Sequence, residues 1–87
     1  MVIVHIPATM RAVTAGERMV SVEGGNLGEV IANLDALYPG LQSRLTEGER
    51  LRAGLAIFVN GVNVSRLLQT KIPSESEIYF APALSGG

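Results

Sequence analysis

The segment from Gly24 to Gly40 contains the one long helical pattern of the sequence, and it restricts the fold more than any other feature. Asn26 is a favourable N-cap residue, and Glu29 three positions later completes a capping-box pattern. Pro39-Gly40 is expected to end the helix. The apolar residues recur at helical spacing and form one stripe: Leu27, Val30, Ile31, Leu34, Leu37 and Tyr38. A single amphipathic helix buries such a stripe most simply against one face of a sheet.

Short runs of β-branched and aromatic residues on both sides of this helix are typical of strands. The expected strands are Val2–Ile6, Met19–Val22, Ala56–Val59 and Ile78–Ala81, with a short strand or a single turn within 62–68. The second strand is expected to be the hairpin partner of the first, and Asn60-Gly61 is a strong tight-turn signal. Residues 42–52 are predicted to form a solvated connector, with one helical turn at 41–45. The fold class is therefore predicted to be α+β, with a mixed sheet of roughly four or five strands on one main helix.

Composition restricts the domain organisation and the ligands. A chain of 87 residues with 47% hydrophobic and 17% charged residues is expected to form one globular domain over 1–87. A net charge of −1 without a basic stretch argues against nucleic-acid binding. The apolar runs are too short to cross a bilayer and the start lacks a basic leader, so we expect a cytoplasmic protein without membrane association. The lack of cysteine excludes disulfides and thiolate chemistry.

The chain ends in Leu84-Ser85-Gly86-Gly87. Glycine has no Cβ, so a di-glycine end can pass through a narrow channel and present its terminal carboxylate to a nucleotide-activating enzyme. A frayed terminus is the alternative interpretation. Pro82 removes a donor from the strand ladder and is expected to end the last strand. We therefore predict that 81–87 is a mobile tail, in which Leu84 anchors in a groove of a partner.

These segments together resemble a known protein family. The start of the helix at Leu27–Ile31, the turn at Phe58–Gly61 and above all the end from Ile78 to Gly87 are similar to small bacterial sulfur carriers. These carriers are of the molybdopterin-synthase small-subunit and thiamin sulfur-carrier type. The resemblance covers essentially the whole chain and implies the ubiquitin-like β-grasp fold. Within the family, Ile6–Arg11 and Tyr38–Gly40 resemble the branch that supplies sulfur for cysteine synthesis from O-phosphoserine.

The resemblance implies a chemical role for the last residue, Gly87. In this family an adenylating enzyme uses ATP and Mg to convert the C-terminal carboxylate to an acyl-adenylate, and sulfide or a persulfide then displaces AMP to leave a thiocarboxylate. The sulfur passes to an acceptor enzyme, such as a cysteine-synthase homologue. The chain would then be a carrier and not an enzyme, with no bound cofactor and no metal. Gly24–Gly28 is rich in glycine but lacks the Lys-Ser/Thr of a phosphate-binding loop.

Strand alternation predicts the surface on which partners dock. If the other strand residues face the helix, five side chains point outward together: Ile3, His5, Phe58, Tyr79 and Ala81. An exposed patch with two aromatic residues beside the tail is a candidate interface. The alternative is that Phe58 or Tyr79 is a boundary residue covered by the connector. His5 is the only histidine, and we expect it on this surface rather than in a metal or catalytic site.

Two other functions stay open at this point. The same activated terminus would serve a ubiquitin-like modifier that is joined through Gly87 to lysines of target proteins. A non-catalytic β-grasp binding module, in which the Gly-Gly end is incidental, is the alternative from a different class. Cysteine synthesis is the preferred destination of the sulfur, and molybdopterin, thiamin and thiolated tRNA are destinations that the sequence does not separate from it.

Overall fold

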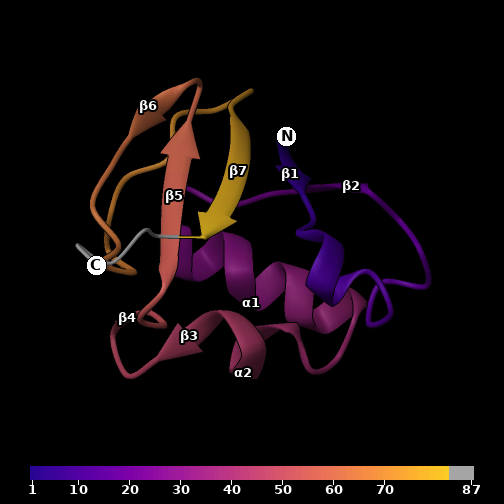
Figure 1. Cartoon of the computed structure of the whole chain (residues 1–87). Coiled ribbons are helices and arrows are strands. Elements are labelled where there is room, and N and C mark those ends of the chain that lie inside the picture. The colour runs from indigo at the N-terminus through magenta and orange to yellow at the C-terminus, as the bar shows by residue number, and fades with distance from the viewer. Residues whose placement is uncertain (83–87) are drawn as a thin grey trace.

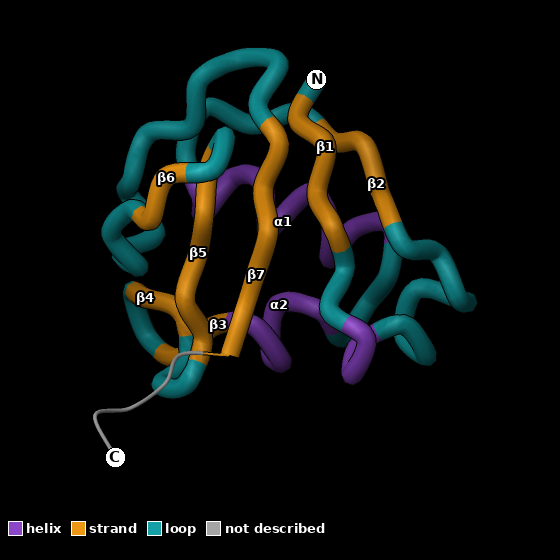
Figure 2. Tube along the Cα trace, turned by 45° about the horizontal axis from the view of Figure 1, so that its top comes forward, coloured by secondary structure: helices purple, strands orange, loops and turns teal. Residues whose placement is uncertain are grey.

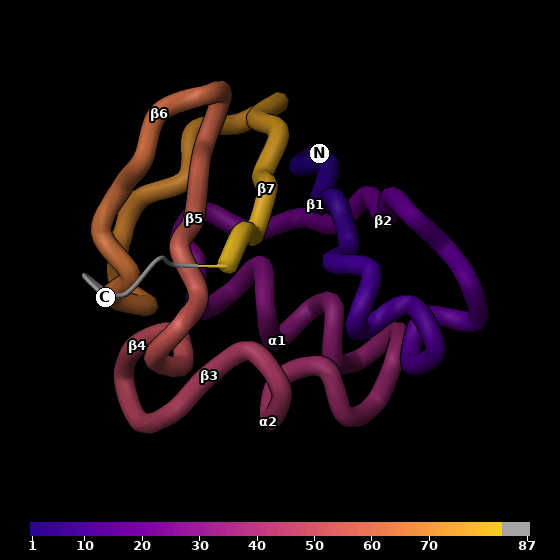
Figure 3. The backbone as a smooth tube through the Cα atoms, in the orientation of Figure 1, coloured from indigo at the N-terminus to yellow at the C-terminus, as the bar shows by residue number. Residues whose placement is uncertain are grey.

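The computed structural model of the chain describes residues 1–82 and contains a five-stranded mixed sheet. The strands are β1 (Val2–His5), β2 (Met19–Val22), β5 (Leu55–Val59), β6 (Val62–Asn63) and β7 (Glu77–Pro82), in the spatial order β2-β1-β7-β5-β6. The central strand β7 pairs in parallel with β1 and antiparallel with β5. Figure 1 shows the long helix α1 (Leu27–Leu37) lying across one face of this sheet. This is the predicted α+β arrangement of a mixed sheet on one main helix, and β7 is yellow between β5 and the indigo β1 in Figure 3.

The helix α1 begins and ends where the sequence predicts. Asn26 is the N-cap, and its Oδ1 accepts a hydrogen bond of 2.8 Å from the backbone N–H of Glu29. Glu29 Oε1 in turn accepts from the backbone N–H of Gly25, just before the N-cap, at 2.8 Å. The first two N–H groups of the helix, of Leu27 and Gly28, donate to the carbonyl oxygens of Thr70 and Leu68 at 2.9 and 2.8 Å. At the other end, Asp35 Oδ1 accepts from the backbone N–H of Gly40 at 3.0 Å. Within residues 1–82, no helix is long and apolar enough to span a membrane.

The core lies between α1 and the sheet. The buried apolar residues of α1 are Leu27, Val30, Ile31 and Leu34, and those of the strands include Val2, Val4, Val20, Val22, Ile57, Val59, Ile78 and Phe80. The predicted helix stripe is wrong at its end, because the Leu37 side chain is 57% exposed and Tyr38 is only half-buried. Leu37 belongs to the last turn of α1, which lies beside the edge strand β2 and lines a surface hollow with Val22. Within residues 1–82, no further strand lies beyond β2 to cover this side chain.

The predicted connector is more ordered than a solvated loop. It contains α2 (Leu41–Leu45), as expected, and then two strands that were not predicted, β3 (Thr46–Glu47) and β4 (Arg50–Leu51). The two strands pair antiparallel around Gly48, which has a φ of 67°. Leu45 and Leu51 are both buried, so this segment closes one side of the core. Strands of two residues are too short to show an alternating pattern in the sequence.

The connection between β1 and β2 is long, although the two strands pair antiparallel as predicted. It contains the 3₁₀ helix η1 (Ala8–Met10) and a series of turns. Thr14 is fully buried in this connection, and its hydroxyl lies 3.2 Å from the carbonyl oxygen of Arg11 and 2.9 Å from that of Glu17. These hydrogen bonds satisfy the buried hydroxyl group and hold the turns together.

The Asn60-Gly61 turn forms as predicted and also fixes the start of β7. Both residues have positive φ, 51° for Asn60 and 83° for Gly61, as a tight hairpin turn between right-twisted strands requires. Asn60 Oδ1 accepts from the backbone N–H of Glu77 at 3.0 Å, and Asn60 Nδ2 donates to Ser76 Oγ at 3.3 Å. The turn that follows β5 therefore holds the first residue of the central strand.

The last strand is longer than the sequence indicates. Ala81 pairs with Ala56, and Pro82 pairs with Leu55 at the start of β5. The prediction of a mobile tail over 81–87 is therefore wrong for its first two residues, because the pairing with β5 continues to Pro82. Proline lacks only the N–H donor, and its carbonyl oxygen and fixed φ are still compatible with the end of a strand. The remaining predicted tail, 83–87, lies outside the described residues.

Two leucines of α1 provide a direct test of this packing. Leu34 is fully buried, so Leu34→Ala is expected to lower the free energy of unfolding by about 2–5 kcal/mol. Leu37→Ala removes the same atoms from the next turn, but its side chain is 57% exposed, and it should cost less than about 0.5 kcal/mol. Chemical denaturation followed by circular dichroism measures both. Equal losses in the two variants would contradict the helix orientation.

Candidate functional site

The face of the sheet opposite α1 is the candidate functional surface, and Figure 2 views the sheet with α1 behind it. We call it the open face and define it by the five residues predicted to point outward: Ile3, His5, Phe58, Tyr79 and Ala81. The strand register places these residues together, since Tyr79 is opposite His5 on one side and Phe58 on the other. Val2, Val4, Ile57, Val59, Ile78 and Phe80, which alternate with them along the strands, are buried on the side of α1. The predicted alternation of the strands is therefore confirmed.

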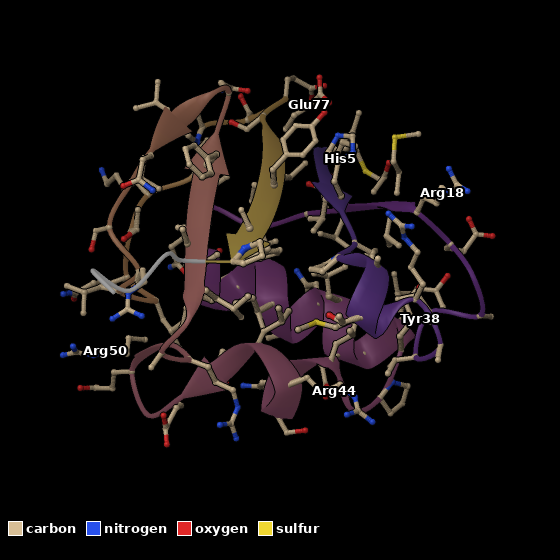
Figure 4. All side chains as sticks on the ribbon, viewed as in Figure 1. His5, Arg18, Tyr38, Arg44, Arg50 and Glu77 are labelled. Carbon is tan, nitrogen blue, oxygen red and sulfur yellow. The ribbon has the colours of Figure 1, made fainter. Side chains whose placement is uncertain are left out.

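The centre of the open face is a contact between His5 and Tyr79. Their rings are stacked, with centroids 3.8 Å apart and an interplanar angle of 8°. His5 Nε2 donates to Glu77 Oε1 at 2.7 Å, and this carboxylate comes from the same strand as Tyr79. The stack and the hydrogen bond together fix the orientation of both rings. Figure 4 shows His5 and Glu77 side by side.

The open face is apolar and extends over several strands. Tyr79 is 46% exposed and Ile3 is 37% exposed, while Phe58, His5 and Ala81 are half-buried. Phe58 lies opposite Asn63 of β6, so it is a partly covered member of this face and not a core residue. Aromatic side chains presented at the surface in this way are typical of the centres of protein interfaces.

Sequence reasoning missed two residues that belong to this surface. Met19 is opposite His5 on β2, and its side chain is 58% exposed. Glu77 begins β7 and holds His5. The alternation that identified Tyr79 also places Glu77 outward, and the predicted alternation of Met19–Val22 points Met19 away from the core. The signal was therefore present in the sequence for both residues.

A hollow of about 420 Å³ adjoins the open face beside His5. Its lining combines apolar residues such as Met19 and Phe80 with the cationic side chains of Arg11 and Arg18. Arg11 Nε donates to the carbonyl oxygen of Ile6 at 3.3 Å, which holds this guanidinium at the end of β1. The hollow therefore offers apolar contact and positive charge next to the exposed aromatic rings.

The open face is continuous with the point at which the chain leaves the sheet. Tyr79 is followed on β7 by Ala81, which faces the same side, and β7 ends at Pro82. The predicted carrier residues Leu84, Ser85, Gly86 and Gly87 follow but lie outside the described residues. A protein bound to the open face would therefore be adjacent to the start of this terminal segment.

The chemistry available on the described part of the chain is limited. Over residues 1–82, no three His, Cys, Asp or Glu side chains come together as a metal-binding group. His5 has one carboxylate neighbour, Glu77, in an exposed setting.

Comparison with known proteins supports the fold, and the matching family model extends to the last residue of the chain. A model of the ThiS family matches residues 4–87. The sulfur carrier protein CysO of Mycobacterium tuberculosis (strain H37Rv) is 36% identical over 91 residues, which cover 99% of this chain and 98% of that protein. The crystal structure of the Amycolatopsis orientalis BexX/CysO complex contains a similar chain, with a TM-score of 0.88, 29% identity and full coverage of both chains.

A protein named for a different role has the same fold. The solution structure of small archaeal modifier protein 1 from Methanosarcina acetivorans is similar with a TM-score of 0.73 and 27% identity. The similarity covers 99% of this chain and 95% of that protein. The fold is thus shared by proteins named as sulfur carriers and as a protein modifier.

Adjacent residues of β7 test the assignment of the open face. Tyr79→Arg places a charge in solvent and removes the stack on His5, so it is expected to cost less than about 1.5 kcal/mol of unfolding free energy. Phe80→Arg places the same charge on the buried side, where Phe80 is 8% exposed, and should cost at least about 3 kcal/mol. Thermal and chemical unfolding measure the stability of both variants. A larger loss of unfolding free energy for Tyr79→Arg than for Phe80→Arg would show that the register of β7 is wrong by one residue.

Proposed function

The chain belongs to the ThiS family and is a ubiquitin-like sulfur carrier, and we propose that it carries sulfur as a thiocarboxylate on Gly87. The observation that supports this most directly is the position of β7. It is the central strand, its outward residues Tyr79 and Ala81 belong to the open face, and its end leads into the terminal segment. A partner that binds the open face therefore has the chain terminus within reach.

The proposed reaction has two steps. The Gly87 carboxylate attacks the α-phosphate of ATP, which releases pyrophosphate and forms an acyl-adenylate. Sulfide, or the terminal sulfur of a persulfide, then attacks the carbonyl carbon, and the bond to the AMP oxygen breaks. With sulfide the product is directly a C-terminal thiocarboxylate, and no oxidation or reduction is needed. With a persulfide the first product is an acyl disulfide, and a thiol must then cleave its S–S bond, which leaves the thiocarboxylate and a disulfide. A carboxylate must be activated in this way because its oxygen is otherwise a poor leaving group.

We propose that the chain is the substrate of this chemistry and not its catalyst. Its sequence has no cysteine nucleophile and no phosphate-binding loop with the required Lys-Ser/Thr. The adenylating enzyme must then supply the ATP and Mg site and the cationic groups that stabilise the transition state. ATP is a cytoplasmic cosubstrate, which supports the cytoplasmic location expected from the sequence.

We propose a cysteine-synthase homologue as the enzyme that accepts the sulfur. Support comes from the similarity to proteins named CysO, one of which was crystallised in a complex with BexX. In this proposal the adenylating enzyme and the acceptor use the open face in turn, because each must hold the same terminus. Molybdopterin, thiamin and thiolated tRNA are the competing destinations of the sulfur.

A second function, conjugation of Gly87 to lysines of other proteins, is supported by the likeness to small archaeal modifier protein 1. The two functions share the acyl-adenylate and differ in the nucleophile that attacks it. Intact mass of the protein after reaction with the adenylating enzyme, ATP, Mg and sulfide separates them. One oxygen-to-sulfur exchange indicates the carrier, whereas lysine conjugates of higher mass in cell extract indicate the modifier.

The terminus is expected to be essential for activation and dispensable for folding. Deletion of Gly86 and Gly87, or addition of one residue after Gly87, should abolish adenylation because the carboxylate no longer reaches the α-phosphate of ATP. The thermal midpoint should stay unchanged, since the core described for residues 1–82 is left intact by both changes. The measurement is release of pyrophosphate together with intact mass. A truncated chain that still forms an adenylate would refute the carrier proposal.

The open face is expected to carry the binding energy of the partner. Phe58→Arg should weaken binding to the adenylating enzyme by more than about 2 kcal/mol if Phe58 is an interface hot spot. Leu37→Arg is the matched control, because it places the same charge at an exposed leucine on the helix side, 57% exposed, and should leave the affinity unchanged. Calorimetric titration measures both, with circular dichroism as the folding control. Equal affinities of the two variants would remove Phe58 from the interface.

A further inference from the structure

Arginine side chains gather at the end of the molecule where β7 leaves the sheet. Pro82 pairs with Leu55, and the backbone N–H of Leu55 donates to the carbonyl oxygen of Arg52 at 3.2 Å. Arg66 Nη1 donates to the same carbonyl oxygen at 3.2 Å. Arg44 and Arg52 line one hollow of about 480 Å³ next to η1. We call Arg44, Arg52 and Arg66 the arginine cluster.

Two of the three guanidinium groups, those of Arg52 and Arg66, are held by backbone carbonyl oxygens, and none of the three forms an ion pair within 1–82. Arg52 Nε donates to the carbonyl oxygen of Ser43 at 3.1 Å, and Arg66 is held by the carbonyl of Arg52. Every ion pair among the described residues involves the Met1 amino group or His5, so no carboxylate of this part of the chain neutralises the cluster. Each fixed guanidinium retains nitrogen atoms that can bind a carboxylate.

The carboxylates that form ion pairs within residues 1–82 lie at the other end of β7. Glu77 begins this strand and binds His5, and Glu75 and Glu23 lie within 2.8 and 3.7 Å of the Met1 amino group. Figure 4 shows Glu77 at the top of the view and Arg44 at the bottom, on the side toward which β7 runs. Glu47 and Glu49 lie in the β3–β4 segment near the cluster, but no ion pair joins either of them to it within residues 1–82. The ion-paired carboxylates are thus at the end opposite the exit of the chain, and the guanidinium groups at the exit have no ion-pair partner among the described residues.

We propose that the arginine cluster docks on an acidic rim of the adenylating enzyme, around the entrance of the channel that receives the terminal segment. This inference rests on the proposed function, because an enzyme that reacts with Gly87 must approach the end of the molecule at Pro82. Carboxylates on such a rim would bind the fixed guanidinium groups, steer the encounter and set the orientation of the terminus. The open face supplies apolar contact, and the cluster supplies a second, charged contact on the other side of the exit.

The test compares variants of the full chain with the adenylating enzyme encoded in the same genome. Arg44→Gln combined with Arg52→Gln should weaken association by about tenfold or more at low salt. It should also flatten the dependence of the association rate on ionic strength, since the steering charges are gone. Arg44→Lys combined with Arg52→Lys keeps both charges and should retain most of the affinity. Lys71→Gln removes an exposed charge beside the start of α1, away from the exit, and should have no effect.

The outcomes separate the two proposals. If the enzyme adenylates the wild-type chain but binds the glutamine variants with unchanged affinity and salt dependence, the acidic rim is refuted and the carrier function stands. If the enzyme adenylates no form of the chain, the proposed function fails and this inference fails with it. Binding of inorganic phosphate to the arginine cluster of the free chain, seen by NMR, together with unchanged enzyme affinity of the variants, would make the cluster a small-anion site and would overturn the docking role.

Discussion

The pairing of β7 on both sides is the constraint on which the rest of the structure depends. This strand joins β1 in parallel and β5 in antiparallel register, so it connects the first and last parts of the chain in one sheet. Its buried residues Ile78 and Phe80 face α1, and period-two alternation then forces Tyr79 to the opposite side. The core and the open face are thus two results of a single register. A shift of this strand by one residue would bury Tyr79 and expose Ile78 and Phe80 together.

The two faces of the sheet differ in what they contact: one packs against α1, and the open face is left at the surface. Burial of apolar area against α1 stabilises the fold, while the open face keeps aromatic and apolar side chains at the surface, where the proposed partners would contact them. The His5–Tyr79 stack is held by Glu77, so part of this surface is already ordered before any partner binds. A surface that is preorganised in this way loses less conformational entropy on association.

The sequence contained enough information for the helix and for both faces of the sheet. Asn26 and Glu29 mark the helix start by chemistry that acts within one turn, and the alternation around Tyr79 depends only on strand geometry. The errors arose where the outcome depends on segments distant in sequence. Leu37 has the right helical spacing for burial, but no strand lies beyond β2 to cover it. Likewise, β7 continues to Pro82 because β5 provides a partner there, which no local signal indicates.

The position of β7 also has a mechanical consequence. A strand that is hydrogen-bonded to neighbours on both sides resists a pull along its axis in shear, because the force is shared among the ladder bonds of both pairings at once. A strand at the edge of a sheet, peeled away sideways, would lose its bonds one after another. The far end of β7 is further anchored, since Asn60 holds the Glu77 backbone. In the proposed function, a partner that pulls on the chain beyond Pro82 would load both pairings of β7 at once, so the sheet would resist the force.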